Sequence, residues 1–218
     1  MNPPISILVV DDHAIVRSSL ARTLNDEQDM TVVGTAGDAD EALAEAIRLK
    51  PAVILMDIDM PGLLCFSAVE TIHARCPGTR VIFLSAFAHD RFIEQALAVE
   101  ASGYITKDEP TQTVVDAIRN AVGGIAYFSP AVRSRIVVDS SGAHLAQRRQ
   151  TRADTLTPRE LEVLRYLARG MSKKEVAATM HLSVKTVEYH SASLMNKLDI
   201  HDRVELARFA IREGLAEP

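Results

Sequence analysis

The sequence lacks the features of a secreted or membrane-bound protein. Cys65 and Cys76 are the only cysteines among 218 residues, which is too few for a disulfide framework or a metal knuckle. No apolar run approaches the roughly 20 residues needed to cross a bilayer. The start, Met1-Asn2-Pro3-Pro4, lacks the basic residues and long apolar core of a signal peptide. We therefore expect a cytoplasmic protein without membrane association.

Charge is unevenly distributed along the chain, although the net charge of −5 and the apolar content of 47% are ordinary. Residues 1–125 hold 9 Lys and Arg against 18 Asp and Glu, whereas residues 126–218 hold 15 against 11. An acidic half followed by a basic half predicts two domains with different partners, cations for the first and a polyanion for the second. Most of the basic excess lies in the connecting segment, so charge alone does not establish nucleic-acid binding.

Short apolar runs alternate with amphipathic segments through the first 123 residues. This rhythm predicts parallel strands covered by helices on both faces. We expect a doubly wound α/β domain over residues 1–125 with a five-stranded parallel sheet. The five predicted strands are Ile5–Val10, Thr31–Ala36, Ala52–Met56, Val81–Leu84 and Gly103–Thr106.

Polar residues follow the carboxyl ends of four of these strands. Asp11 and Asp12 follow the first, Asp57 the third, Ser85 the fourth and Lys107 the fifth. These ends share one edge of a parallel sheet, where ligands bind in such folds. Three neighbouring carboxylates repel one another and need a cation, and an oxygen-only site suits Mg²⁺. Lys107 and Ser85 would neutralise charge on a phosphoryl group attacked by Asp57.

These motifs resemble the signature set of a bacterial response-regulator receiver domain, which has a flavodoxin-like fold. The match covers about 120 residues, with a motif at the carboxyl end of the first, third, fourth and fifth predicted strands. The matching stretches are Asp11-Asp12, Leu55-Met56-Asp57 with Met60-Pro61-Gly62, Leu84-Ser85-Ala86 and Gly103-Tyr104-Ile105-Thr106-Lys107.

The resemblance implies a role for each site residue. Asp57 would accept a phosphoryl group from a sensor histidine kinase. The carboxylates of Asp11, Asp12 and Asp57 and the backbone carbonyl of Asp59 would hold Mg²⁺. Lys107 would pair with the phosphate, while Ser85 and Tyr104 would act as the switch. Leu63-Leu64-Cys65-Phe66 departs from the family, which often has a glycine there, and the apolar Phe87 predicts an altered lifetime of the phosphorylated state.

The strand–helix rhythm stops after residue 125, and we predict a linker over residues 126–153. The stretches Ser140-Ser141-Gly142 and Gln147–Arg152 are polar and flexible in character. A solvated tether is favoured over DNA-phosphate contact for its arginines, which are Arg133, Arg135, Arg148, Arg149 and Arg152.

Residues 154–218 carry helix punctuation and no strand signals, which predicts an all-α domain of four helices. Thr157-Pro158-Arg159-Glu160 is a capping box with proline at the first helical position, and Gly170 is a stop signal. Ser172 with Glu175 forms a second box, Ser183 caps the third helix, and Asp202 begins the fourth. A tight turn between the second and third helices predicts a helix-turn-helix.

The third helix of this domain presents a polar stripe of Lys185, Glu188, Tyr189 and Ala192 opposite its apolar face. A recognition helix needs such a face to meet base edges. The domain resembles the LuxR-type DNA-binding domain through Leu156–Glu160, Lys173–Ala177 and Ser183–His190. The resemblance implies that Lys185 and Thr186 contact phosphate or bases, with Glu188, Tyr189 and Ala192 on the same surface. An ordinary solvated helix face is the alternative interpretation.

Residues 154–218 hold 10 basic and 10 acidic groups, so we expect modest monomer affinity and binding to double-stranded promoter DNA as a homodimer. The layout resembles that of NarL/FixJ-type response regulators, which implies a phosphorylation-controlled transcription regulator and not an enzyme. Two alternatives remain. Asp57-Ile58-Asp59 superficially fits the nucleophile pair of haloacid-dehalogenase-like phosphatases, and the receiver could be degenerate and independent of phosphate.

Overall fold

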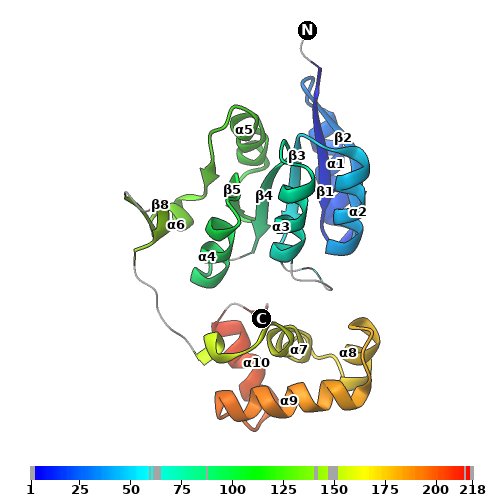
Figure 1. The fold of residues 1–218 in the computed structure, drawn as a ribbon, viewed down its shortest axis with the longest axis vertical. Helices are drawn as coiled ribbons and strands as arrows, with labels where there is room; N and C mark the ends of the chain where they lie inside the picture. Colours follow the sequence, from blue (N-terminus) through cyan, green and yellow to red (C-terminus); the bar gives the residue numbers. More distant parts are fainter. Residues whose placement is uncertain are drawn as a thin grey trace. The chain divides into compact units, whose positions relative to one another are not determined.

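The chain forms two compact units, residues 1–147 and 148–218 (Figure 1). The computed structural model describes residues 3–58, 60, 65–86, 88–139, 142–146, 152–213 and 215–216. Within this described part of the chain, no helix is long and apolar enough to cross a membrane.

The first unit is a doubly wound α/β fold, as the sequence predicts. Its sheet is parallel and has the strand order β2-β1-β3-β4-β5-β6. The strands are β1 (Ile5–Val10), β2 (Met30–Ala36), β3 (Val53–Asp57), β4 (Arg80–Ser85), β5 (Gly103–Thr106) and β6 (Tyr127–Phe128). The helices between them are α1 (Ala14–Asn25), α2 (Ala39–Leu49), α3 (Cys65–Arg75), α4 (Asp90–Ala98) and α5 (Thr111–Val122).

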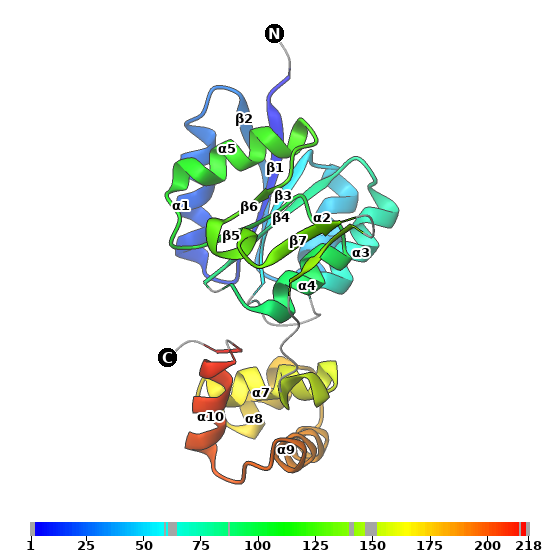
Figure 2. The same cartoon turned by 90° about the vertical axis from the view of Figure 1, so that its left-hand side faces the viewer.

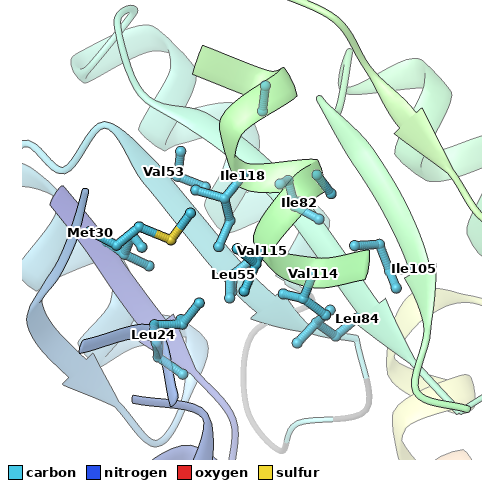
Figure 3. Packing of buried hydrophobic residues seen from close by; sticks show 14 residues of the cluster. Leu24, Met30, Val53, Leu55, Ile82, Leu84, Ile105, Val114, Val115 and Ile118 are labelled. Atoms are coloured by element: carbon cyan, nitrogen blue, oxygen red, sulfur yellow. The ribbon is translucent and has the colours of Figure 1, made fainter. Parts of the chain in front are cut away.

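Helices cover both faces of this sheet because its central strands are apolar on both sides. Helices α1 and α5 lie on one face and α2, α3 and α4 on the other (Figure 2). On the α1–α5 side, Leu55 and Ile82 pack against Val115 and Ile118 of α5 (Figure 3). On the opposite side, the ring of Phe83 lies 4.8 Å from that of Phe66 on α3, measured between centroids.

The sheet has six strands and not the predicted five, because β6 extends it beyond β5. Tyr127 and Phe128 pair with Gly103 and Tyr104. The backbones approach so closely that a Cβ on Gly103 would lie 2.7 Å from the Tyr127 carbonyl oxygen, so a glycine is required there. A strand of two residues is too short to show an alternating pattern, which explains why the sequence prediction omitted it.

The segment predicted as a linker contains further structure after β6. Helix α6 (Pro130–Arg133) is followed by an antiparallel hairpin of β7 (Ile136–Asp139) and β8 (Gly142–Leu145). The hairpin lies against α4 (Figure 1). Each strand has four residues, most of them exposed, so neither gives the buried apolar run by which the strands of the main sheet were predicted.

The second unit has the four predicted helices, preceded by a short 3₁₀ turn at Arg152–Thr155. They are α7 (Pro158–Ala168), α8 (Lys173–Thr179), α9 (Val184–Leu198) and α10 (Arg203–Arg212). Both predicted capping boxes are present, at Thr157 with Glu160 and at Ser172 with Glu175. The caps at Ser183 and Asp202 also form, because each side chain accepts a hydrogen bond from a backbone N–H of the following turn.

Candidate functional site

Three carboxylates meet at the carboxyl edge of the first unit's sheet. Asp11 and Asp12 directly follow β1, and Asp57 is the last residue of β3, its neighbour in the sheet. Asp11 and Asp57 are fully buried, whereas the side chain of Asp12 is 19% exposed. One potential ligand atom from each of these residues and from His13 lies within 4.8 Å of the others. The parallel topology therefore brings Asp57 together with acidic residues that lie 45 and 46 positions before it in the sequence.

Lys107 is the cation of this cluster, which we call the acidic site. Its Nζ lies 3.0 Å from Asp57 Oδ2 and 3.1 Å from Asp11 Oδ2. Burial alone would lower the pKa of Lys107, but attraction to Asp57 and Asp11 outweighs it and raises the pKa above its ordinary value. The ammonium group therefore stays charged at neutral pH and holds the two carboxylates together.

Ser85 and Tyr104 lie behind this edge and are both fully buried. Ser85 ends β4 and pairs with Thr106, the residue before Lys107. The Lys107 N–H donates to the Ser85 carbonyl over 2.7 Å, which ties the two strand ends together. The structure thus brings Ser85 to the same edge as the acidic site, while Asp59 and Phe87 fall outside the described residues.

The donor set of the acidic site suits a hard divalent cation. Three carboxylates face one ammonium group, so a divalent ion would reduce the remaining repulsion. Their oxygen atoms are the ligands that Mg²⁺ prefers, particularly beside a phosphate group. Among the described residues of this cluster, His13 supplies the one nitrogen ligand atom, but its side chain is 65% exposed and its Nδ1 lies 2.9 Å from Asp12 Oδ1. The residues present therefore fit Mg²⁺.

A second candidate surface lies on α9 in the second unit. Lys185, Glu188 and Ala192 are exposed, and Tyr189 is 71% exposed. Thr186 is half-buried, and its N–H donates to the Ser183 cap. The predicted stripe is therefore accessible on the surface.

The opposite face of α9 is packed into the unit. Val187, Leu194 and Leu198 are fully buried there. This burial fixes which side of the helix faces outward, because residues three or four apart share a face.

Glu160 anchors α9 to the start of α7. It is only 3% exposed and accepts hydrogen bonds from the Thr157 N–H, from Ser193 Oγ over 2.6 Å and from Lys197 Nζ over 2.7 Å. Burial would raise the pKa of Glu160, but these hydrogen bonds lower it to about 2. The sequence revealed only the capping contact. The two contacts to α9 need the folded chain, since they span more than thirty residues.

Two arginines of the predicted linker, Arg135 and Arg152, have structural partners. Arg135 Nη1 lies 2.8 Å from Asp90 Oδ1 at the start of α4. Arg152 donates to the Leu198 carbonyl and lies over the ring of Phe209. Arg148 and Arg149 lie outside the described residues.

Sequence reasoning also missed a buried serine that contacts Thr106, the residue before Lys107. Ser129, directly after β6, is fully buried, and its Oγ accepts the N–H of Thr106 over 3.0 Å. Its position after a two-residue strand gave no periodic signal.

Each of the two units matches a known protein family. Residues 7–119 match the response regulator receiver domain, and residues 154–210 match the bacterial regulatory proteins of the luxR family. Together these matches cover most of the chain.

Two curated relatives match over almost the whole chain. The uncharacterized transcriptional regulatory protein YxjL of Bacillus subtilis (strain 168) is 32% identical over 213 residues, which cover 98% of each chain. The oxygen regulatory protein NreC of Staphylococcus carnosus (strain TM300) is 33% identical over 215 residues, which cover 97% of this chain and 99% of the relative.

Solved structures agree with the fold. The response regulator ChrA of a heme-sensing two-component system is 28% identical, with a TM-score of 0.52 over 98% of this chain and 100% of that one. The Salmonella typhimurium RcsB response regulator is 21% identical, with a TM-score of 0.68 over 97% and 99% of the two chains. The second likeness concerns the fold alone.

Proposed function

Because this chain belongs to the response regulators that join a receiver domain to a luxR-type DNA-binding domain, we propose that Asp57 is its phosphoryl acceptor and that phosphorylation controls binding to promoter DNA. The phosphoryl donor would be a sensor histidine kinase. The observation that carries the proposal is the contact of Lys107 with both Asp57 and Asp11 beside Asp12 at one sheet edge.

The chemistry proposed for Asp57 is a direct phosphoryl transfer. One Asp57 oxygen attacks the phosphorus, a P–O bond forms, and the P–N bond to the donor imidazole breaks. The imidazole leaves with the bonding electron pair and takes up a proton. Lys107, already beside Asp57, stabilises the negative charge of the transferred group.

A magnesium ion would complete this site. The proposed ligands are the carboxylates of Asp11, Asp12 and Asp57 and the backbone carbonyl of Asp59. When bound, the ion supplies positive charge that offsets the carboxylates and the phosphoryl oxygens. The burial of Asp11 and Asp57 supports this role, since buried carboxylates need compensating charge.

Ser85 and Tyr104 are the proposed switch. Phosphorylated Asp57 would draw the Ser85 hydroxyl and the Lys107 ammonium toward the new phosphate oxygens, and Tyr104 would change its rotamer in step. Support comes from the backbone hydrogen bond between Lys107 and Ser85, because neither residue can shift without affecting the other.

The output would be sequence-specific DNA binding through α9. Lys185 and Thr186 are proposed to contact phosphate or bases, and Glu188, Tyr189 and Ala192 to lie against the major groove. A homodimer would supply two recognition helices for two half-sites. The proposed place of action is the cytoplasm, where promoter DNA lies.

The phosphatase alternative is not favoured by the topology. Haloacid-dehalogenase-like enzymes carry their aspartate pair on the first strand, whereas Asp57 ends β3. The fully buried Asp11 and the Lys107 contact also argue against a degenerate receiver.

Labelling with a small phosphodonor tests the proposal. Purified protein is incubated with acetyl phosphate and Mg²⁺, and the modified residue is located by mass spectrometry after borohydride trapping of the acyl phosphate. We expect modification of Asp57 and its loss in Asp57→Asn. Asp40→Asn, at an exposed aspartate on α2, is the matched control. Equal labelling of Asp57→Asn and wild type would reject the assignment.

A further inference from the structure

Ser129 lies at the edge of the sheet, directly after β6. Its N–H donates to the Tyr104 carbonyl over 2.9 Å, which continues the pairing of β6 with β5. Its carbonyl then accepts the N–H groups of Val132 and Arg133, so the chain turns into α6 at this residue. Ser129 is therefore the point where the backbone leaves the sheet.

Beyond this point the side chain of Ser129, and not its backbone, accepts the next hydrogen bond from β5. Its Oγ accepts the Thr106 N–H over 3.0 Å and lies 3.3 Å from Thr106 Oγ1. Ser129 is fully buried and Thr106 is 7% exposed. Without this oxygen, the Thr106 N–H would lose the acceptor that replaces water, and such a loss is costly in a buried site.

Thr106 in turn is adjacent to the acidic site. The next residue is Lys107, whose Nζ contacts Asp57 and Asp11 and whose N–H donates to the Ser85 carbonyl. A short path of direct contacts therefore runs from the acidic site through Thr106 to Ser129.

The chain beyond Ser129 also contacts helix α4. Arg135 pairs with Asp90 at the first turn of α4, and the hairpin β7–β8 lies against the same helix. Helix α4 follows β4, which ends in Ser85. The connecting segment, residues 129–146, thus contacts the last residue of β5 through Ser129 and the helix that follows β4 through Arg135 and β8.

We propose that Ser129 is a positioning residue that couples the acidic site to the connecting segment, so that phosphorylation of Asp57 changes the stability of residues 129–146. This inference rests on the proposed function of Asp57. A shift of Lys107 and Ser85 toward a phosphoryl group moves the Thr106 backbone, and the Thr106–Ser129 hydrogen bond passes that movement to the chain leading to the second unit. Coupling of this kind is reciprocal, so the connecting segment also biases the acidic site.

Hydrogen exchange of the full-length protein tests the coupling. Exchange of the backbone amides in 129–146 is measured with and without acetyl phosphate and Mg²⁺, in wild type and in Ser129→Ala. We expect phosphorylation to change wild-type exchange by about fivefold or more, the lower end of typical couplings between sites. In Ser129→Ala this ratio should fall to about 1.

Ser134→Ala is the matched control, because it removes the same group from the same segment. Ser134 Oγ is exposed and donates to the Ala131 carbonyl, with no contact to β5 among its described hydrogen bonds. Its exchange ratio should equal that of wild type. Ser129→Cys serves where Ser129→Ala does not fold, since a thiol fills similar space but accepts hydrogen bonds weakly. Its ratio should lie between those of the other two.

The outcomes separate this inference from the function on which it rests. Wild type that is not labelled on Asp57 overturns both. Wild type that is labelled but shows no change in exchange of 129–146 overturns only the coupling. A wild-type ratio preserved in Ser129→Ala, or in Ser129→Cys where that variant is needed, also overturns it.

Discussion

The two units each bury carboxylates, but they neutralise them differently. In the second unit, the carboxylate of Glu160 accepts hydrogen bonds from an ammonium group, a hydroxyl and a backbone N–H. In the first unit, Asp11 and Asp57 share the ammonium group of Lys107, and the carboxylate of Asp12 lies beside them. A saturated carboxylate contributes to structure, whereas a cluster with excess negative charge can take up a cation and react.

Removing Lys107 should have the largest effect. In Lys107→Met, the negative charge of the phosphoryl group loses its nearest protein cation, and we expect labelling of Asp57 to slow by about 100-fold, as for loss of one charge-stabilising donor. Mg²⁺ affinity should rise, because the metal no longer competes with the ammonium group. A time course of Asp57 labelling measures the rate, and isothermal titration calorimetry measures the Mg²⁺ affinity. Weaker Mg²⁺ binding in the variant would contradict the claim that the carboxylates of the acidic site carry more negative charge than Lys107 neutralises.

Replacing Glu160 should destabilise the second unit. Its folded pKa of about 2 lies below the ordinary 4.5, so its ionised form stabilises the fold above pH 4.5 and this stabilisation disappears as the pH falls toward 2. The shift of about 2.5 pKa units, at about 1.4 kcal/mol for each unit, predicts that Glu160→Gln lowers the free energy of unfolding by up to about 3.5 kcal/mol at pH 7. Urea unfolding at pH 7 and pH 3 measures this loss.

The pH comparison is the control for Glu160. The difference between wild type and Glu160→Gln should shrink at pH 3, where the wild-type advantage is partly lost. An equal difference at both pH values would show that Glu160 acts through packing and not through its charge.

Neutralising the exposed charge of α9 should weaken DNA binding. Lys185→Gln should reduce affinity by about tenfold, within the range for one contact to a base or phosphate. Lys50→Gln, at the end of α2 in the first unit, is the matched control and should bind as wild type. Fluorescence anisotropy with a DNA fragment recovered from genomic selection measures both. Equal affinities would remove Lys185 from the interface.

The exposed pair of Arg135 and Asp90 should have the smallest effect, because surface ion pairs contribute about 0–1 kcal/mol. Arg135→Asp should increase hydrogen exchange in β8 by a few-fold at most, about the factor that this energy allows. The double variant Arg135→Asp with Asp90→Arg should restore it. Failure of the swap to restore exchange would indicate that the hairpin lies on α4 through packing alone.

Most of the fold follows from patterns that the sequence displays directly. Apolar runs such as Val53–Met56 predict the parallel strands, and the boxes at Thr157 and Ser172 locate two helix starts. The strand-end positions of Asp57 and Lys107 then predict that these residues meet, because parallel topology gathers those ends at one edge.

The connecting segment could not be predicted in this way. Strand β6 has two residues, and its pairing depends on close approach to Gly103. The hydrogen bond from Thr106 to Ser129 joins residues 23 positions apart, and no periodic signal accompanies it. Likewise, the reach of Glu160 to Lys197 arises only when α7 and α9 pack together. Contacts of this kind depend on tertiary structure and leave little trace in local sequence.

The most direct measurement is the affinity of wild type and Asp57→Asn for one recovered DNA fragment, each with and without acetyl phosphate and Mg²⁺. Wild-type affinity should change by about fivefold or more on phosphorylation, as typical couplings do, and Asp57→Asn should show no change. A wild-type affinity that is independent of the phosphodonor, or an equal response in Asp57→Asn, would contradict control of DNA binding by this aspartate.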